Sequence, residues 1–185
     1  MKIEIRSRGA ARARAGWTLL EIMISTVILL VVLMGFSYGL VSATSLERVT
    51  REQGQAREAA RAQIELLRAL PLEEVLERYD DLPGNDPEGG SSPGASFDVP
   101  GLTPRPGAEA VGTIVFPLSE EGELREDLER AELGMPRDLT GEGELDDLDH
   151  SGDYRMLPVL VRLEWRGAGG DCRLEMATVL KRMRP

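Results

Sequence analysis

Residues 16–46 read GWTLLEIMISTVILLVVLMGFSYGLVSATSL, and this stretch decides the fold. Glu21 is its only charged residue, so residues 22–46 carry no charge at all. As an α-helix, residues 22–46 would extend about 38 Å at 1.5 Å per residue. The hydrocarbon core of a bilayer is about 30 Å thick. We therefore expect residues 17–46 to form a single membrane-spanning helix.

The charges that flank this stretch predict its orientation. Basic residues precede it, and none follows until Arg48; the preceding ones are Lys2, Arg6, Arg8, Arg12 and Arg14. The positive-inside rule then places residues 1–16 in the cytoplasm and the rest of the soluble chain across the membrane. A cleaved secretory signal is the first alternative, but its apolar region is shorter, about 7–15 residues. An ordinary single-span anchor is the second alternative.

The junction between the basic segment and the apolar run is Gly16-Trp17-Thr18-Leu19-Leu20-Glu21. It resembles the class III signal of type IV prepilins, in which a basic leader ends in Gly and is followed by an aromatic residue, Thr-Leu, an aliphatic residue and Glu. The resemblance implies cleavage between Gly16 and Trp17 by a prepilin peptidase, which also methylates the new amine of Trp17. The family usually has Phe at that position, and Trp17 keeps a large aromatic side chain there. Residues 1–16 would then be a basic leader peptide.

Glu21 is the residue in this motif that raises a physical question. A carboxylate at the bilayer centre costs about 2.5–3.5 kcal/mol on insertion scales, and less near the interface. The resemblance implies an assembly role for Glu21, in which it pairs with the N-terminal amine of a neighbouring subunit. In a dry filament core an unpaired charge would be costly, so this pairing would fix the register of the subunits. The alternative is a carboxylate that interacts only with the helix dipole.

Residues 47–79 continue the helical pattern in amphipathic form. Mostly apolar or small side chains, with one glutamine among them, recur at three- and four-residue steps between charged ones: Leu46, Val49, Gln53, Ala56, Ala60, Ile64, Leu67 and Leu70. Pro71 should end the helix at Leu70, and residues 72–79 can form a further short helix. Gly35 and Gly39 either loosen the apolar part of the helix or let it pack closely in lipid.

The rest of the chain predicts a small β-rich head. Residues 80–110 are rich in Gly and Pro and should form a loop, and residues 111–185 should form an antiparallel β head. Within it, residues 111–116 are a strand candidate, and residues 159–166 and 172–180 alternate as a hairpin about the turn 167–170. The acidic insertion 119–153 should be solvated, with a short helix at 123–133. The predicted fold class is therefore α+β: a long N-terminal transmembrane helix whose C-terminal half packs on a small antiparallel sheet, as in pilins.

Other chemistry finds little support in the sequence. The acidic run offers oxygen ligands for Ca²⁺ at Asp146, Asp147, Asp149 and Asp153, but it lacks the spacing of an EF-hand loop, so we expect a solvated acidic turn. His150 is the only histidine and should be an exposed loop residue, while Cys172 should be a small buried apolar residue. We expect no cofactor and no enzymatic activity. Without residues 1–16 the chain has 17 basic and 31 acidic residues, a net charge of −14, which argues against nucleic-acid binding by the soluble part.

These observations together predict a structural subunit of the inner membrane, a minor pilin or minor pseudopilin with a periplasmic head. The resemblance implies three kinds of partner: the prepilin peptidase, other pilin or pseudopilin subunits, and an inner-membrane assembly platform. A type IV pilus, a type II secretion pseudopilus and a DNA-uptake system remain open. The alternative from another class is a single-span membrane-anchored extracytoplasmic binding protein.

Overall fold

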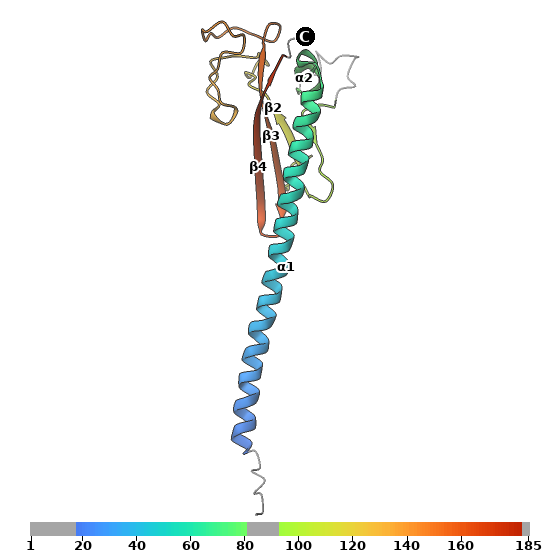
Figure 1. The fold of residues 1–185 in the computed structure, drawn as a ribbon, viewed down its shortest axis with the longest axis vertical. Coiled ribbons are helices and arrows are strands. Elements are labelled where there is room, and N and C mark those ends of the chain that lie inside the picture. The colour runs from blue at the N-terminus through green and yellow to red at the C-terminus, as the bar shows by residue number, and fades with distance from the viewer. Residues whose placement is uncertain (1–17, 81–92, 183–185) are drawn as a thin grey trace, which may run out of the picture. The chain divides into compact units, whose positions relative to one another are not determined.

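The computed structural model describes residues 18–80 and 93–182 of the 185-residue chain (Figure 1). The chain divides into two compact units, Met1–Thr44 and Ser45–Pro185. Helix α1 (Leu19–Ala69) begins in the first unit and ends in the second. The remaining helices and all the strands belong to the second unit.

The second half of α1 is amphipathic, as its sequence predicts. Ala56, Ala60, Ile64 and Leu67 are buried at three- and four-residue steps, which places them on one face of the helix. The helix ends at Ala69, one residue before the predicted end. Pro71 then lies at the N-cap of α2 (Leu72–Tyr79), where the missing N–H of proline removes no helical hydrogen bond.

The sheet has four antiparallel strands in the order β1-β2-β3-β4. Their bounds are Ser96–Phe97 for β1, Gly112–Val115 for β2, Met156–Gly167 for β3 and Gly170–Lys181 for β4. The β3–β4 hairpin pairs along its full length, from Met156 opposite Lys181 to Gly167 opposite Gly170. Gly170 has a φ of 120°, which glycine adopts without strain, so the predicted turn at 167–170 is confirmed.

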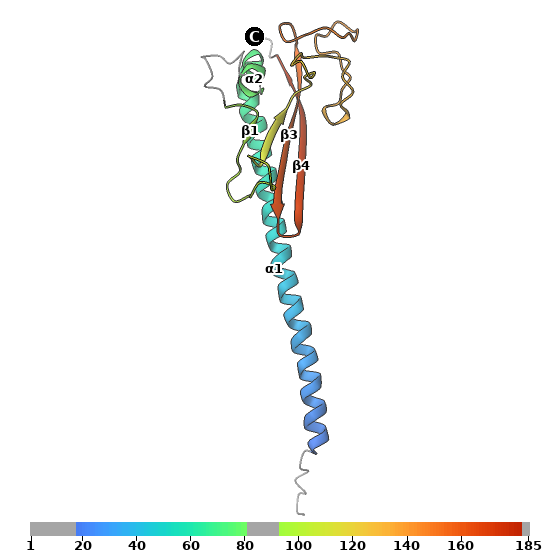
Figure 2. The same cartoon turned by 180° about the vertical axis from the view of Figure 1, so that it is seen from behind.

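The second half of α1 packs on one face of the sheet, and this arrangement confirms the predicted α+β fold class. Val161, Leu163 and Trp165 alternate along β3 and pack in one buried cluster with Ala56 and Ala60 of α1. Small side chains on the helix let it approach the strands closely. A second cluster lies around α2 and the other half of β3. Figures 1 and 2 show α1 running along the strands in both views.

The acidic insertion differs from its prediction. A 3-10 helix at Ala131–Leu133 replaces the helix expected over 123–133, and the segment is not fully solvated. Leu124, Leu133 and Leu139 are buried and join the cluster around α2 and β3. They cover the part of the sheet that would otherwise expose Leu160 to water. The free energy gained by burying these leucines outweighs the preference of the neighbouring acidic residues for solvent.

The loop predicted over 80–110 also contains a short strand. Of its residues, 81–92 lie outside the described part of the chain. β1 pairs with β2 through only two residues, with Phe97 opposite Gly112. A Cβ on Gly112 would stand 2.3 Å from the ring of Phe97, so the ring packs directly on the glycine backbone. This contact explains why a glycine opens β2.

Candidate assembly surface

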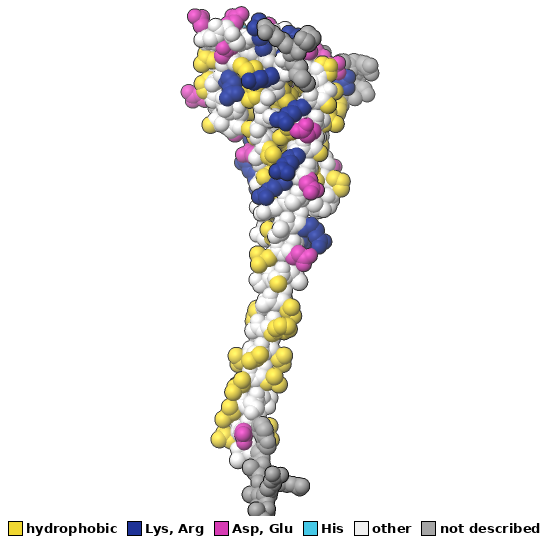
Figure 3. Space-filling model, in the orientation of Figure 1, with side chains coloured by type: hydrophobic (Ala, Val, Ile, Leu, Met, Phe, Trp, Pro, Cys, Tyr) yellow, Lys and Arg dark blue, Asp and Glu magenta, His cyan; other side chains and the backbone are white. Residues whose placement is uncertain are grey.

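The first half of α1 is apolar on every side. Side chains that point in all directions from the helix axis are exposed, among them Leu19 at 78%, Leu33 at 50% and Val41 at 69%. Figure 3 shows hydrophobic side chains along this part of the helix and charged ones along its second half. A helix that is apolar all round needs lipid or other apolar protein around it. Among the described helices, α1 is long and apolar enough to cross a membrane.

Two of the hydroxyl groups in this apolar segment bond to the helix itself. Thr26 donates to the carbonyl of Ile22 at 2.8 Å, and Ser37 donates to that of Leu33 at 2.9 Å. Such bonds satisfy the donors inside the helix, where lipid offers no partner. Thr26 and Ser37 therefore do not oppose an apolar environment.

The start of α1 has a capping arrangement. The Thr18 hydroxyl accepts a hydrogen bond from the backbone N–H of Glu21 at 3.3 Å, and the Thr18 carbonyl accepts from the same group at 3.0 Å. Thr at the N-cap with Glu three residues later is the capping-box pattern. Thr18 therefore caps the N-terminus of α1, a role that the sequence analysis did not assign to it. The Thr-x-x-Glu spacing is the signal that could have found it.

Of the predicted site residues in this region, only Glu21 belongs to the part of the chain that the structure describes. Gly16 and Trp17, the predicted cleavage and methylation positions, lie outside the described residues. Glu21 is exposed in the first turn of α1, and within residues 18–80 and 93–182 its carboxylate forms no ion pair. Its position at the helix N-terminus is favourable for a carboxylate without any partner subunit.

Gly35 and Gly39 lie inside α1 without interrupting it. Apart from the adjacent residues and the nearby backbone of α1 itself, no atom of the described chain comes within 4 Å of the Cβ that either glycine lacks. The helix is continuous through both positions. Both predicted uses, loosening of the helix and close packing in lipid, therefore stay predictions.

The acidic insertion contains a buried histidine, and the prediction that His150 is exposed is wrong. His150 is 7% exposed, with its Nε2 2.8 Å from Asp146 Oδ1 and its Nδ1 3.1 Å from Asp153 Oδ1. A carboxylate on each ring nitrogen favours the doubly protonated ring. Burial lowers the pKa of His150, but the bonds to Asp146 and Asp153 and the charge of Glu126 outweigh it, so the pKa is raised. The histidine is thus a buried counter-ion for the acidic run.

The four candidate Ca²⁺ ligands do not all gather in one place. Ligand atoms of Glu126, Asp146 and His150 lie within 4.8 Å of one another, and Asp146 is the only one of the four candidate aspartates in this group. Asp149 instead accepts hydrogen bonds from the backbone N–H groups of Leu124 at 3.0 Å and Ser151 at 3.1 Å. Asp149 thus serves as a turn acceptor, and Asp153 bonds to His150. Glu126, which sequence reasoning missed, is 1% exposed and accepts from the N–H groups of Leu139 and Thr140.

Cys172 is half-buried and packs against the cluster under α1, so it is more accessible than predicted.

Comparison with protein-family models, with curated proteins and with solved structures found no match to this chain. The likeness to pilins therefore rests on the arrangement of the helix and the sheet alone. A long apolar N-terminal helix followed by a small antiparallel sheet is compatible with a pilin-like fold.

Proposed function

We propose that this chain is a pilin-like structural subunit, a minor pilin or minor pseudopilin that works by assembly. The observation that carries the proposal is the first half of α1. Its surface is exposed and apolar, and Glu21 is the only charged residue between Leu19 and Leu46. Such a surface needs a bilayer before assembly and apolar neighbours afterwards, and an assembling subunit requires both.

The mechanism has four steps. The basic leader stays in the cytoplasm while α1 enters the inner membrane. A prepilin peptidase cuts between Gly16 and Trp17 and methylates the amine of Trp17. The mature subunit waits in the membrane until an assembly platform extracts it. The apolar halves of α1 then bundle in the filament core, with each Glu21 beside the N-terminal amine of a neighbour.

Glu21 supports this mechanism because no other charged residue lies between Leu19 and Leu46. In lipid, its position in the first turn lets the carboxylate remain near the interface, where the energetic cost is small. In a dry bundle the same carboxylate would be unsatisfied unless a cation met it. The capping hydrogen bond to Thr18 uses the backbone of Glu21, so its carboxylate remains available to a neighbouring subunit.

Cleavage of the full chain tests the proposal. The chain is expressed with and without a prepilin peptidase, beside Gly16→Val and the matched leader variant Gly9→Val. We expect the peptidase to shorten the natural chain and the Gly9→Val variant, but not Gly16→Val. If the natural chain keeps its full length with active peptidase, the proposal fails. A membrane-anchored binding protein that retains residues 1–16 would then be favoured.

A further inference from the structure

The acidic insertion gathers ligand atoms for a cation around its buried histidine. A carboxylate oxygen of Glu126, one of Asp146 and a ring nitrogen of His150 lie within 4.8 Å of one another. Glu126 and His150 are buried, while Asp146 is exposed. Two of the three ligands are therefore built into the core of the head, and the third opens the group to solvent. We call Glu126, Asp146 and His150 the insertion cluster.

Glu126 brings a buried oxygen to the insertion cluster that has no donor. Its Oε1 accepts hydrogen bonds from the backbone N–H groups of Leu139 and Thr140. Within the part of the chain that the structure describes, its Oε2 accepts no hydrogen bond, and no ion pair joins Glu126 to His150. A buried carboxylate oxygen without a donor is costly unless a cation meets it. A metal ion bonded to each side chain at about 2.0–2.2 Å would bridge the gap between them.

His150 is oriented as metal-binding histidines are. Its Nδ1 lies 3.1 Å from Asp153 Oδ1, and its Nε2 lies 2.8 Å from Asp146 Oδ1. A histidine that binds a metal through one ring nitrogen usually donates the N–H of the other to a carboxylate or carbonyl, which fixes the tautomer and the ring. Asp153 can accept from Nδ1–H in this way, which leaves Nε2 for the cation.

The charges around His150 also favour a divalent ion. The carboxylates of Glu126, Asp146 and Asp153 lie around a ring that carries at most one positive charge. Among the described residues, no Lys or Arg pairs with any of these three carboxylates. A divalent cation on the neutral imidazole balances one negative charge more than a proton on the same ring does.

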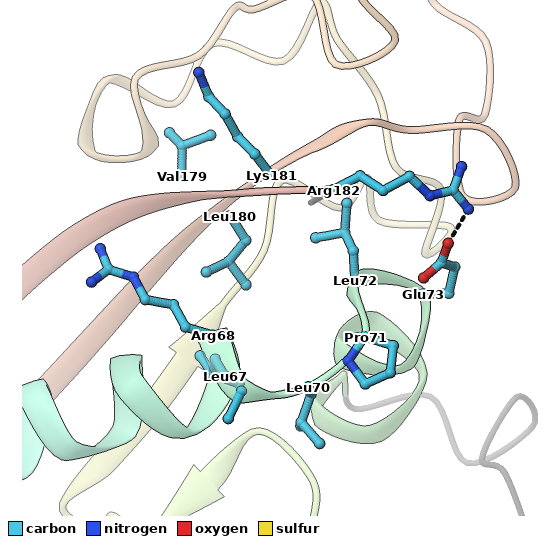
Figure 4. Close-up of a pocket in the computed structure, with 11 residues that line it drawn as sticks. Leu67, Arg68, Leu70, Pro71, Leu72, Glu73, Val179, Leu180, Lys181 and Arg182 are labelled. Atoms are coloured by element: carbon cyan, nitrogen blue, oxygen red, sulfur yellow. Dashed lines mark hydrogen bonds and ion pairs between the residues drawn. The ribbon is translucent and has the colours of Figure 1, made fainter. Parts of the chain in front are cut away.

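A larger pocket of the head offers no comparable set of ligands. It has a volume of about 510 Å³ and lies at the corner between α1 and α2, beside the end of β4 (Figure 4). Among the described residues that line it, Glu73 provides the only carboxylate, and Glu73 already pairs with Arg182. The other charged side chains of the lining, Arg68 and Lys181, are basic. This pocket is therefore not a cation site.

We propose that the insertion cluster binds one Zn²⁺ through Nε2 of His150, Oε2 of Glu126 and a carboxylate oxygen of Asp146. Asp153 is a positioning residue, because it contacts the ring and not the ion. One imidazole nitrogen with two carboxylates suits Zn²⁺, whereas Ca²⁺ takes about 6–8 oxygen ligands. Three protein ligands leave a fourth tetrahedral position for water on the exposed side of the cluster.

The bound ion would hold the insertion together. Glu126 belongs to the first part of the insertion, and Asp146 and His150 belong to its last part, so one ion joins the two. An ion that binds only the folded chain raises the midpoint of thermal unfolding. This inference goes beyond the proposed function, because the site requires neither membrane insertion nor cleavage nor assembly.

Titration of the metal-free full chain in detergent with Zn²⁺ tests the site. The chain carries Cys172→Ser, which removes its only thiol, and a purification tag without histidine. NMR of the imidazole Cε1–H follows the single histidine, and elemental analysis after dialysis counts the bound ions. We expect one Zn²⁺ per chain, a shifted imidazole resonance and a higher midpoint of thermal unfolding. The same concentration of Ca²⁺ should produce none of these changes.

Two adjacent aspartates provide matched variants, because Asp146 and Asp147 are both exposed and only Asp146 belongs to the insertion cluster. Asp146→Asn should weaken Zn²⁺ binding at least ten-fold, and Asp147→Asn should leave it unchanged. The amide oxygen of Asp146→Asn can still accept from the N–H of Leu148, so this variant should unfold like the natural chain in metal-free buffer. Asp153→Asn should weaken binding about ten-fold without changing the stoichiometry, as the loss of a positioning carboxylate does.

Several results would overturn the site. These are the absence of saturable Zn²⁺ binding, an imidazole resonance that does not move at saturation, and an equal response to Ca²⁺. Equal affinities of Asp146→Asn and Asp147→Asn would also overturn it, because they would indicate general attraction of cations to the acidic run. Cleavage at Gly16 affects none of these readouts, so failure of the metal site and failure of the proposed function are distinguishable.

Discussion

The buried carboxylate of Glu52, on α1, accepts a hydrogen bond from the backbone N–H of Ala168 at the turn of the β3–β4 hairpin, 3.3 Å away. Glu52 is 8% exposed, and its other oxygen lies 3.0 Å from Arg48 Nε. A single side chain thus joins the helix to the far end of the hairpin, 116 positions along the chain. The buried charge is tolerated because both oxygens have partners.

Glu52→Ala should therefore destabilise the head by about 1–3 kcal/mol, because it leaves the turn N–H without its acceptor. The measurement is urea or thermal unfolding of the full chain in detergent. The control is Glu47→Ala, whose side chain is 71% exposed in its pair with Arg51 and should change stability by less than about 0.5 kcal/mol. Equal effects of the two variants would show that the hydrogen bond between Glu52 and Ala168 does not stabilise the head.

Glu126→Ala should cost more, about 3 kcal/mol, because its carboxylate accepts from two buried N–H groups, those of Leu139 at 2.6 Å and Thr140 at 3.1 Å. The same unfolding experiment measures this loss, with the exposed Glu129→Ala as the control. We expect Glu129→Ala to unfold like the natural chain. A neutral Glu126→Ala would mean that this carboxylate does not organise the insertion.

His150 gives the chain a pH dependence whose sign follows from its surroundings. Its pKa is raised, so its contribution to stability is complete below its unfolded-state pKa of about 6.5 and is lost as the pH rises through the folded-state value. The N–H of Leu148 and then His150 lower the pKa of Asp146, so the contribution of Asp146 is lost as the pH falls through its own folded-state value. The ion pair between His150 and Asp146 therefore stabilises the insertion at pH values between the folded-state pKa of Asp146 and that of His150.

NMR of the imidazole Cε1–H measures this directly, because the chain has only one histidine. We expect its midpoint to lie above about 6.5, and Asp153→Asn to lower it by removing one carboxylate. Asp98→Asn, at an exposed residue of the loop beside β1, is the matched control and should leave the midpoint unchanged. A midpoint below 6.5 in the natural chain would contradict the buried ion cluster.

The helices and strands whose apolar residues recur at regular intervals could be predicted from the sequence. The apolar run and the three- and four-residue steps through Ala56, Ala60 and Ile64 predicted α1, and alternation predicted the β3–β4 hairpin. β1 was missed because two residues, Ser96 and Phe97, are too few to alternate. Short strands of this kind depend on a neighbour, here the bare backbone of Gly112.

The insertion could not be predicted because its buried residues have no period. Leu124, Leu133 and Leu139 fall at irregular intervals among acids, and their burial depends on the sheet face that they cover. His150 did leave a signal, since carboxylates four residues before it and three after it, Asp146 and Asp153, offered it ion pairs. The position of a carboxylate on each ring nitrogen required the three-dimensional structure.

Glu21→Gln should separate processing from assembly. The peptidase should still cut after Gly16, while incorporation into filaments should fall by at least ten-fold, because in the proposed assembly a neutral amide could not balance the amine of the neighbouring subunit. The measurement is the amount of subunit in sheared filaments relative to membranes. Glu47→Gln, at the exposed ion pair with Arg51, should assemble normally. Normal assembly of Glu21→Gln would leave the helix dipole as the sole role of this carboxylate.

The identity of the mature N-terminus tests the central claim most directly. The full chain is purified from membranes that contain an active prepilin peptidase, and its N-terminal peptide is sequenced by mass spectrometry. We predict a chain that begins at Trp17 with a methylated amine. An N-terminus at Met1, or a cut at any other position such as after Ala43, would contradict the account.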